Sequence, residues 1–273
     1  MTISATPALE VRNLGKDYIQ AQPFSLAQFT IQAFEDIDLT VQRGETLAIV
    51  GESGAGKSSL ARCLALLESP SRGEIFFDGN SALNRPKQEL FVLRRKVQLI
   101  FQNPTASLNP QFSALEIVAE PLRIQRIGTR KQQCDRAIEL MQLVGLSPNT
   151  ASKRSLEFSG GQRQRLAIAR ALALEPSLLI LDEVLSNLDR ANQENILRLL
   201  EELQAAHSLT FVHISHDLPL VSQFADEVAV MRAGFIVEHQ ATRKLFSDPQ
   251  HSYTRQLLRA MKPVEANWLG RSA

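Results

Sequence analysis

The sequence has few cysteines and no long hydrophobic run. Its 273 residues include two cysteines, Cys63 and Cys134. Two are too few for a disulfide framework, and we expect both to be reduced thiols buried on helices. The longest stretch without a charged residue, 18–34, contains four glutamines and a proline, which excludes a membrane span there. No apolar segment follows a basic start near the N-terminus, so we expect no signal peptide.

The chain also lacks an excess of charge of either sign. Its 30 Lys and Arg residues nearly balance 29 Asp and Glu residues, for a net charge of +1. This balance argues against a strongly basic nucleic-acid binder and against a disordered chain. Hydrophobic residues make up 44% and charged residues 22%, as in ordinary globular proteins. A chain of this length can bury a sizeable core without disulfides, as one large domain or two small ones.

Strand and helix patterns alternate along the chain. Apolar or alternating runs predict strands at 8–13, 37–41, 46–50, 74–78, 97–101, 178–181, 210–215, 227–231 and 235–237. Helical periodicity predicts helices at 57–68, 114–126, 130–144, 161–174 and 191–206, with a short helical tail from residue 239. This alternation predicts an α/β fold with a mostly parallel central sheet. The mainly helical run 103–154 is predicted to be an insertion.

A phosphate-binding loop is the clearest motif. Residues 51–58 (GESGAGKS) fit G-x-x-x-x-G-K-[ST] and stand between a predicted strand and a predicted helix. The glycines let successive N–H groups point at phosphate oxygens, and the helix start adds partial positive charge. Lys57 is expected to reach the β- and γ-phosphates and Ser58 to bind Mg²⁺. The alternative is an ordinary glycine-rich turn.

Two carboxylates follow an apolar strand. Residues 178–181 (LLIL) precede Asp182 and Glu183, which places both at the carboxyl edge of the sheet, where ligands of open α/β sheets bind. Asp182 suits a Mg²⁺ site, and Glu183 can orient or deprotonate an attacking water. The alternative is a strand that runs into a solvated turn.

A second glycine motif, 159–162 (SGGQ), opens the helix predicted at 161–174. It makes a second helix start suited to anions. One nucleotide does not need both motifs within one subunit. The economical arrangement is two subunits head to tail, each giving this motif to the γ-phosphate of the other. The alternative is that Ser159 is an ordinary N-cap.

Together, in this order, the motifs resemble an ATP-binding cassette (ABC) ATPase over residues 9–258. The resemblance implies a P-loop NTPase core, an N-terminal antiparallel β subdomain, and a helical subdomain inserted after the Gln102 loop. It implies one ABC ATPase domain over 1–273. Within it, 1–102 and 155–240 form the catalytic core with the β subdomain, 103–154 the helical subdomain and 241–273 a short C-terminal tail.

The resemblance also implies residue roles. Glu183 matches the catalytic glutamate, His216 the histidine that senses the γ-phosphate, and Gln102 a glutamine that contacts water and metal. Ser58, Gln102 and Asp182 are the expected Mg²⁺ ligands. The residues expected to bind ATP are Tyr18, Gly51, Glu52, Ser53, Gly54, Ala55, Gly56, Lys57, Ser58, Ser59, Ser159, Gly160, Gly161, Gln162 and Asp189. Asp189 belongs to the loop 186–189, which includes Asn187 and matches one that crosses the dimer interface. Tyr18 is the expected adenine-stacking residue, with Phe24 and Phe29 as alternatives.

Three runs resemble the oligopeptide/dipeptide/nickel importer branch of the family, namely 51–54 (GESG), 100–110 (IFQNPTASLNP) and 248–254 (DPQHSYT). That branch pairs two ATPases with two membrane permease subunits and an extracytoplasmic solute-binding protein. The chain departs from the pattern at Val184, where proline usually follows the catalytic glutamate, and we expect a small change in loop stiffness there. Ser252 replaces a usual proline. No cysteine follows Cys134, so we expect no iron–sulfur centre.

The predicted function is an ATPase that uses ATP and Mg²⁺ to energise import of a small solute, a peptide, nickel or a metal chelate, through a separate permease. We expect it at the cytoplasmic face of the plasma membrane, with 103–154 docking a permease helix and with no nucleic-acid partner. The sequence leaves open which solute is carried and whether the ATPase dimer is homo- or heteromeric.

The alternative function is that of a soluble ABC-type ATPase in DNA repair or translation. Repair types separate the two halves of the site by a long coiled coil, whereas 125 residues without heptads separate Lys57 from Asp182 here. Translation types carry two cassettes, and this chain has one. A P-loop kinase or GTPase would leave the SGGQ motif and His216 without a role.

Overall fold

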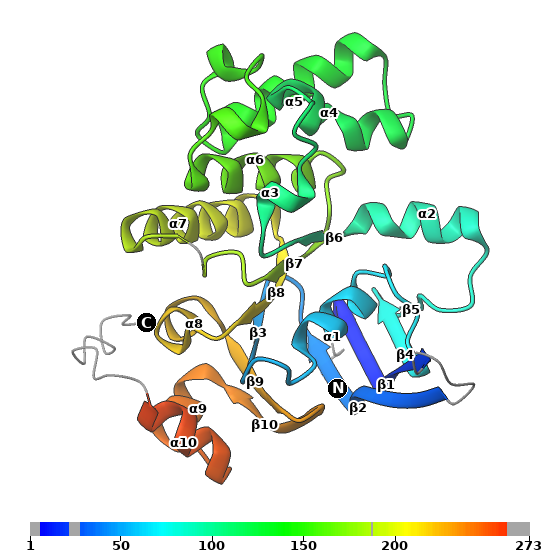
Figure 1. Ribbon diagram of the computed structural model, residues 1–273, viewed down its shortest axis with the longest axis vertical. Coiled ribbons are helices and arrows are strands. Elements are labelled where there is room, and N and C mark those ends of the chain that lie inside the picture. Colours follow the sequence, from blue (N-terminus) through cyan, green and yellow to red (C-terminus); the bar gives the residue numbers. More distant parts are fainter. Residues whose placement is uncertain (1–5, 22–27, 187, 261–273) are drawn as a thin grey trace.

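The structure is a computed structural model that describes residues 6–21, 28–186 and 188–260 (Figure 1). Its central sheet has the strand order β10-β9-β3-β8-β7-β6. Neighbouring strands run parallel, except that β10 is antiparallel to β9. The strands are β3 (Thr46–Val50), β6 (Val97–Ile100), β7 (Leu178–Asp182), β8 (Thr210–Ser215), β9 (Glu227–Arg232) and β10 (Phe235–Ala241). Every residue of β3, β7 and β8 is buried, which explains their continuous apolar runs. The predicted α/β fold with a mostly parallel sheet is confirmed.

An antiparallel sheet of order β2-β1-β4-β5 packs beside the central one. It consists of β1 (Leu9–Ala21), β2 (Gln28–Val41), β4 (Arg72–Phe77) and β5 (Asn80–Ser81). Together with helix α1 (Lys57–Leu64) it encloses a core that includes Leu9, Ile37 and Leu60. β1 and β2 extend well beyond the predicted strands. Their far ends lack the expected alternation because the hairpin projects into solvent, where Ile19 is 73% exposed.

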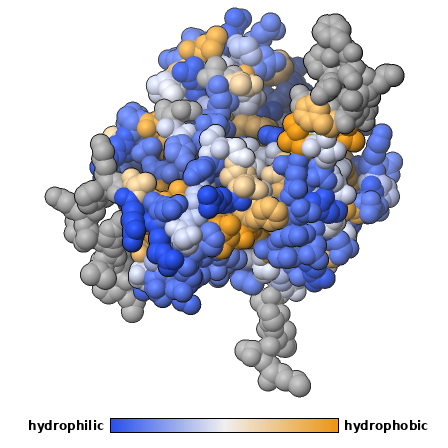
Figure 2. All heavy atoms as spheres, turned by 60° about the horizontal axis from the view of Figure 1, so that its bottom comes forward, coloured by the Kyte–Doolittle hydropathy of each residue, from blue (hydrophilic) through white to orange (hydrophobic). Residues whose placement is uncertain are grey.

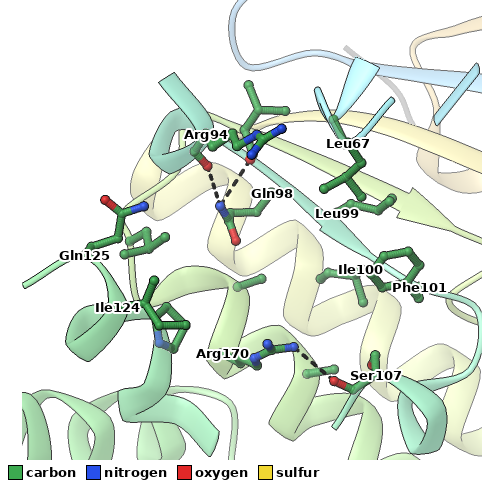
Figure 3. Close-up of a pocket in the computed structure, with 16 residues that line it drawn as sticks. Leu67, Arg94, Gln98, Leu99, Ile100, Phe101, Ser107, Ile124, Gln125 and Arg170 are labelled. Carbon is green, nitrogen blue, oxygen red and sulfur yellow. Dashed lines mark hydrogen bonds between the residues drawn. The ribbon is translucent and has the colours of Figure 1, made fainter. Parts of the chain in front are cut away.

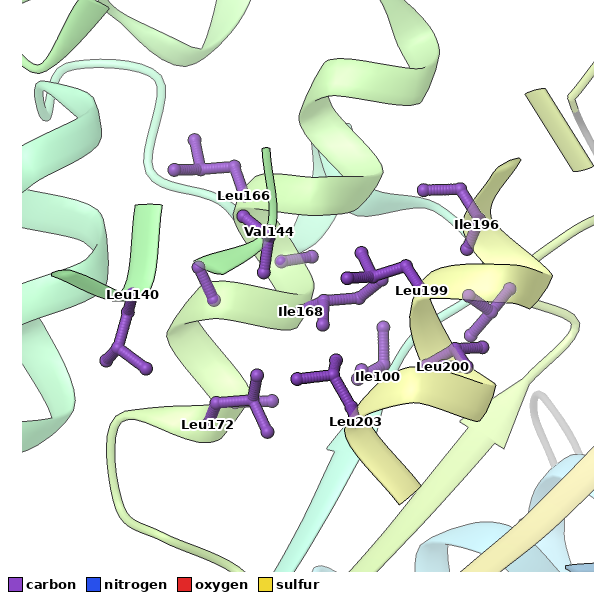
Figure 4. Close-up of a cluster of buried hydrophobic side chains, with 14 of the residues drawn as sticks. Ile100, Leu140, Val144, Leu166, Ile168, Leu172, Ile196, Leu199, Leu200 and Leu203 are labelled. Atoms are coloured by element: carbon purple, nitrogen blue, oxygen red, sulfur yellow. The ribbon is translucent and has the colours of Figure 1, made fainter. Parts of the chain in front are cut away.

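Helices α4 (Ala114–Ile124), α5 (Arg130–Leu143), α6 (Gly160–Leu172) and α7 (Arg190–His207) share a second core with one face of the central sheet. Figure 4 shows α6 between the two sides of this core, with Leu166 and Ile168 of α6 lying between Leu140 of α5 and Leu199 of α7. Capping boxes begin α4 at Ser113 and α5 at Thr129, which fixes where these predicted helices start. The short helices α3 (Pro104–Ser107), η1 (Pro148–Thr150) and η2 (Ser155–Glu157) connect them.

Two helices were not predicted from the sequence. Helix α2 (Lys87–Lys96) has no buried residue, so the periodicity that marks a packed helix is weak there. Helix α8 (Leu218–Phe224) is seven residues long, with Pro219 in its first turn, and is too short for a periodic pattern. The C-terminal segment also differs, because β10 continues to Ala241 before α9 (Thr242–Ser247) and α10 (Ser252–Ala260) form the helical tail.

The cysteines, the helix lengths and the surface bear on the expectations drawn from composition. Cys63 is buried on α1, and burial raises the pKa of its thiol to about 11, whereas Cys134 is partly exposed, contrary to the prediction that both are buried. No helix in the described ranges is long and apolar enough to cross a bilayer. The face shown in Figure 2 is mostly polar, with apolar side chains gathered in small patches.

We predict that His213 makes folding weaker in acid. It is fully buried on β8, with 5.7 Å between the centres of its ring and the Phe224 ring, and burial lowers its pKa from the usual 6.5 to about 4. The unfolded chain therefore binds a proton at a higher pH than the folded chain does. The resulting stability is present above pH 6.5 and is lost as pH falls from 6.5 towards 4, by about 3 kcal/mol.

The measurement is denaturant unfolding of the wild type and His213→Leu at pH 7, 6, 5 and 4. The His213→Leu variant is expected to lose less stability over this range. His207→Gln, at an exposed histidine, is the control and should keep the wild-type dependence. Equal losses in wild type and His213→Leu would contradict the prediction.

Candidate functional site

The predicted phosphate loop follows β3 and leads into α1. Its backbone needs glycine, since Gly51, Gly54 and Gly56 have φ values of 152°, 83° and 101°, in the region that other residues rarely adopt. A Cβ atom at Gly51 would collide with the carbonyl oxygen of Met231, and one at Gly56 with that of Ala33. The loop thus lies tightly against β9 on one side and β2 on the other.

Lys57 points back into this loop. Its side chain is buried, and its ammonium donates hydrogen bonds to the carbonyl oxygens of Gly51 and Glu52, both at 2.7 Å. Burial lowers the pKa of Lys57, although the carboxylates of Glu183 and Asp182 oppose that effect. A buried ammonium whose hydrogen-bonded partners here are neutral carbonyls is poised to exchange them for an anion.

The structure brings Ser58 and Asp182 together across the sheet edge. The Ser58 hydroxyl donates to Oδ1 of Asp182 at 3.2 Å, and Asp182 is 7% exposed at the end of β7. Burial raises the pKa of the Asp182 carboxyl, whereas the hydrogen bond from Ser58 lowers it. A hydroxyl and a buried carboxylate beside the glycine loop form a set of hard oxygen ligands, which suits Mg²⁺.

Glu183, Gln102 and His216 form a polar cluster beside the loop. The Gln102 amide donates to Oε2 of Glu183 at 2.8 Å, and Nδ1 of His216 lies 3.4 Å from the same oxygen. Glu183 has a φ of 49°, an uncommon backbone conformation for a residue with a side chain. Its backbone N–H donates to Ile214 at the end of β8, which fixes the turn and directs the carboxylate to the loop.

A cavity of about 470 Å³ connects the loop to this cluster. Its lining residues are Val50, Gly51, Glu52, Ser53, Glu183, His216, Leu218 and Leu257. One face of the cavity thus carries loop backbone, and another carries a carboxylate and an imidazole. This combination holds an anionic group next to a base, as a reaction between water and a phosphate requires.

The motif at the start of α6 lies apart from this cavity. Ser159 is exposed and caps α6, accepting a hydrogen bond from the N–H of Gln162, while the Gln162 side chain accepts one from the N–H of Ser159. Gly161 packs so closely on α7 that a Cβ atom would lie 2.8 Å from Oδ1 of Asn192. The described residues that line the cavity include none from Ser159 to Gln162. Within one chain Ser159 is therefore an N-cap, the alternative that the sequence left open.

Asp189 and Tyr18 also have partners within the chain. Asp189 caps α7, and the hydrogen bonds from Asn192 lower its pKa. Asn187, in the same loop, lies outside the described residues. The Tyr18 hydroxyl donates to Oε2 of Glu68 at 2.6 Å and lies 3.3 Å from Oγ of Ser59, which places Tyr18 against the first turn of α1.

The surroundings of Tyr18 and the position of Phe29 both bear on the expected adenine contact. The ammonium of Lys16 lies 5.0 Å from the centre of the Tyr18 ring, so one cation already contacts this aromatic group. Phe29 is 40% exposed and pairs with Gln20 towards the far end of the hairpin. Phe24 lies outside the described residues.

Sequence reasoning missed the contribution of the C-terminal helix. Tyr253 and Leu257 of α10 reach the phosphate loop, since the N–H of Glu52 donates to the Tyr253 hydroxyl at 3.2 Å and Leu257 lines the cavity. The run 248–254 was singled out by its resemblance to an importer branch, without a role in the site. Tyr253, an aromatic residue within an otherwise polar run, was the sequence feature that could have indicated a buried contact there.

A groove of about 280 Å³ separates α2 and β6 from the helical layer (Figure 3). Its rim carries Leu67, Phe101 and Ile124, which are 49%, 39% and 57% exposed. Arg170 lies at its floor and donates to the carbonyl oxygen of Ser107 at 3.2 Å. Phe101, which lines the groove, directly precedes Gln102, whose amide donates to Glu183 of the polar cluster.

Comparisons with known proteins agree with this geometry. A family model described as ABC transporter matches residues 34–186. A probable peptide ABC transporter ATP-binding protein, y4tS of Sinorhizobium fredii, is 46% identical over 92% of this chain and 72% of its own length. The dipeptide transport ATP-binding protein DppF of Haemophilus influenzae is 39% identical over 96% of this chain and 80% of its own length.

Solved structures show the same fold. The dimeric ATP-binding cassette MJ0796, bound to ADP and Pi in a post-hydrolysis state, has a TM-score of 0.76 and 29% identity, and the match covers 86% of this chain and 99% of that one. The cbiO1 protein of Clostridium perfringens, part of the ABC transporter complex cbiONQ, has a TM-score of 0.75 and 27% identity over 89% of this chain and 92% of that one.

We predict that Gly56 and Gly54 differ in their tolerance of a methyl group. Gly56→Ala combines a strained φ with a collision at the backbone of Ala33, and should lower the free energy of unfolding by about 2 to 4 kcal/mol. Gly54→Ala has the same kind of φ, but no described atom lies within 4 Å of its Cβ position, so about 1 kcal/mol is expected. Denaturant unfolding of both variants measures the difference, and equal losses would refute it.

Proposed function

This chain is an ATPase of the ABC transporter family, and from that premise we propose that it energises import of a small solute through a separate membrane permease. The observation that carries the proposal is the cluster of Gln102, Glu183 and His216 beside the Lys57 loop. The names of the relatives favour a peptide as the solute over the nickel or metal chelate also predicted from the sequence. These relatives lend no support to a role in DNA repair or translation.

Binding of ATP follows from the loop. We expect backbone N–H groups of the loop 51–59 other than that of Glu52 to hold the phosphates, and Lys57 to exchange its carbonyl partners for β- and γ-phosphate oxygens. Ser58, Asp182 and Gln102 would hold Mg²⁺, which supplies charge neutralisation on the phosphates. Tyr18, adjacent to Ser59, remains the proposed contact for adenine.

Hydrolysis requires a water aligned with the γ-phosphorus. In the proposal Glu183 accepts a hydrogen bond from this water while its carboxylate stays fixed by Gln102 and His216. A bond forms between the water oxygen and the γ-phosphorus, the bond to the β–γ bridging oxygen breaks, and Glu183 accepts the proton that the water gives up, so that ADP and phosphate result. His216, 58% exposed at the cavity, is placed to contact the γ-phosphate.

The second half of each site is proposed to come from another subunit. Ser159 and Gly160 are exposed and do not line the cavity of their own chain, so the Ser159 hydroxyl and the start of α6 can face a γ-phosphate held by a partner ATPase. Asp189 at the start of α7 is exposed as well, as the crossing loop 186–189 requires. The dimeric state of the MJ0796 cassette supports this arrangement.

The groove that separates α2 and β6 from the helical layer (Figure 3) is proposed to receive the permease. Its exposed apolar rim suits a short amphipathic helix, and its Phe101 adjoins Gln102, so that docking can influence the cluster around Glu183. The proposed complex has two ATPases, two permease subunits and an extracytoplasmic solute-binding protein. The ATPases then lie at the cytoplasmic face of the membrane.

We predict that Glu183→Gln lowers ATP turnover of the assembled complex by about 10²-fold or more. The amide cannot accept a proton, so turnover should fall. Because it keeps the shape of the side chain, ATP binding should persist. Phosphate release measures turnover. The control Glu139→Gln changes an exposed carboxylate on α5 and should leave turnover unchanged. Near-wild-type turnover in Glu183→Gln would overturn the assigned role.

A second prediction concerns Ile124, which is 57% exposed on the groove rim. Ile124→Asp places a charge where an apolar helix face is proposed to pack, and should reduce co-purification with the permease about tenfold while ATP affinity is kept. Leu143→Asp, 44% exposed on α5 and outside the groove, is the matched control. Equal recovery of permease with both variants would contradict docking at this groove.

A further inference from the structure

The C-terminal helix α10 contacts the phosphate loop directly. The hydroxyl of Tyr253 accepts a hydrogen bond at 3.2 Å from the backbone N–H of Glu52. Leu257, one helical turn further along the same face, lines the cavity that also contains Glu183 and His216. A helix some two hundred positions downstream of the loop in the sequence therefore forms part of its wall.

Tyr253 is fixed in place from several sides. It is 2% exposed and packs in a core with Val50 of β3 and Val230 of β9. The Arg232 guanidinium lies 4.7 Å from the centre of its ring, a favourable cation–π distance. A side chain held in this way can impose its position on the peptide that it contacts.

The start of the tail is held by one carboxylate of the sheet. Glu238 of β10 accepts hydrogen bonds from the backbone N–H groups of Gln250 at 2.7 Å and His251 at 2.9 Å. The N–H of Tyr253 in turn donates to Nδ1 of His251 at 3.1 Å. The position of α10 is thereby tied to the central sheet and not to the loop alone.

Glu52 stands between Tyr253 and Lys57. Its carbonyl oxygen accepts from the Lys57 ammonium at 2.7 Å, while its N–H donates to Tyr253. If Lys57 turns to a phosphate, as the proposed function requires, the first of these bonds is lost. The bond to Tyr253 does not involve the lysine and remains to hold this part of the loop.

We propose that Tyr253 is a positioning residue of the nucleotide site, whose hydroxyl holds the Glu52 peptide so that the first half of the loop keeps its shape when Lys57 engages phosphate. Gly51, Glu52 and Ser53 line the cavity with Glu183 and His216, on the side proposed for the γ-phosphate. The effect of Tyr253 therefore falls on ATP more than on ADP. This inference rests on the proposed function.

The test is equilibrium binding to the full chain, by titration calorimetry, of a non-hydrolysable ATP analogue and of ADP. Tyr253→Phe removes the hydroxyl and keeps the packed ring. We expect the Kd of the analogue to rise about fivefold, the size of one neutral hydrogen bond, and the Kd of ADP to change less than about twofold. Glu52→Pro removes the donor, because proline has no N–H, and Glu52→Gln keeps it.

Combining the variants separates the hydrogen bond from a general effect of the tail. Adding Tyr253→Phe should change little in the Glu52→Pro background, and should have its full effect in the Glu52→Gln background. Equal effects in both backgrounds, or no effect on the wild type, would overturn the inference. If Glu52→Pro does not fold, as judged by circular dichroism, the comparison of the ATP analogue with ADP in Tyr253→Phe decides. Absence of ATP binding by the wild-type chain would instead overturn the proposed function itself.

Discussion

The register of the parallel strands at one edge of the central sheet determines where the reacting groups meet. Ile100 of β6 pairs with Leu181 of β7, and Asp182 pairs with Ile214 of β8. Gln102 and Glu183 each lie two residues beyond the first pair, so both stand just past the carboxyl ends of neighbouring strands. His216 follows Ile214 by the same interval. Gln102 and His216, from distant parts of the chain, thus reach one oxygen of the Glu183 carboxylate because the pairing of β6, β7 and β8 brings their ends to one edge of the sheet.

A second constraint is the close fit of the loop between its neighbours. The carbonyl oxygen of Ala55 accepts a hydrogen bond from Gly234 in the β9–β10 turn, and Gly234 accepts one from Glu35 of β2. The loop is therefore tied to both sheets, and glycine at Gly51 and Gly56 is needed for the backbones to approach so closely. This rigidity has a chemical value, since a loop already held in one shape needs little reorganisation when an anion arrives.

Much of the fold could be predicted from the sequence where local pattern and tertiary environment agree. Strands β3 and β8 were predicted with their observed ends, because both are buried along their whole length and are bounded by turns. The far arms of β1 and β2 and the helix α2 lie at the surface, where no core imposes a pattern. Within the site, the loop and the Asp-Glu pair followed from motif and strand position, whereas Gln102 and His216 were assigned by family resemblance. The contact between Glu52 and Tyr253 spans 201 positions, and a pattern of periodicity carries no information about such a pair.

The position of Gln102 suggests how a signal from the groove reaches the cluster. The ladder between β6 and β7 ends at Ile100, so Phe101 and Gln102 lie beyond the last pair that holds this strand to the sheet. Phe101 faces the groove and is partly exposed, while Gln102 contacts Glu183. Glu183, by contrast, is held by its own N–H bond to Ile214. In the proposed complex, a helix docked in the groove would therefore move the Gln102 amide relative to the backbone of Glu183, and would change the hydrogen bond between the two side chains. In that proposal Phe101 and Gln102 would be the segment that moves, and the paired strands of the sheet edge would stay in place.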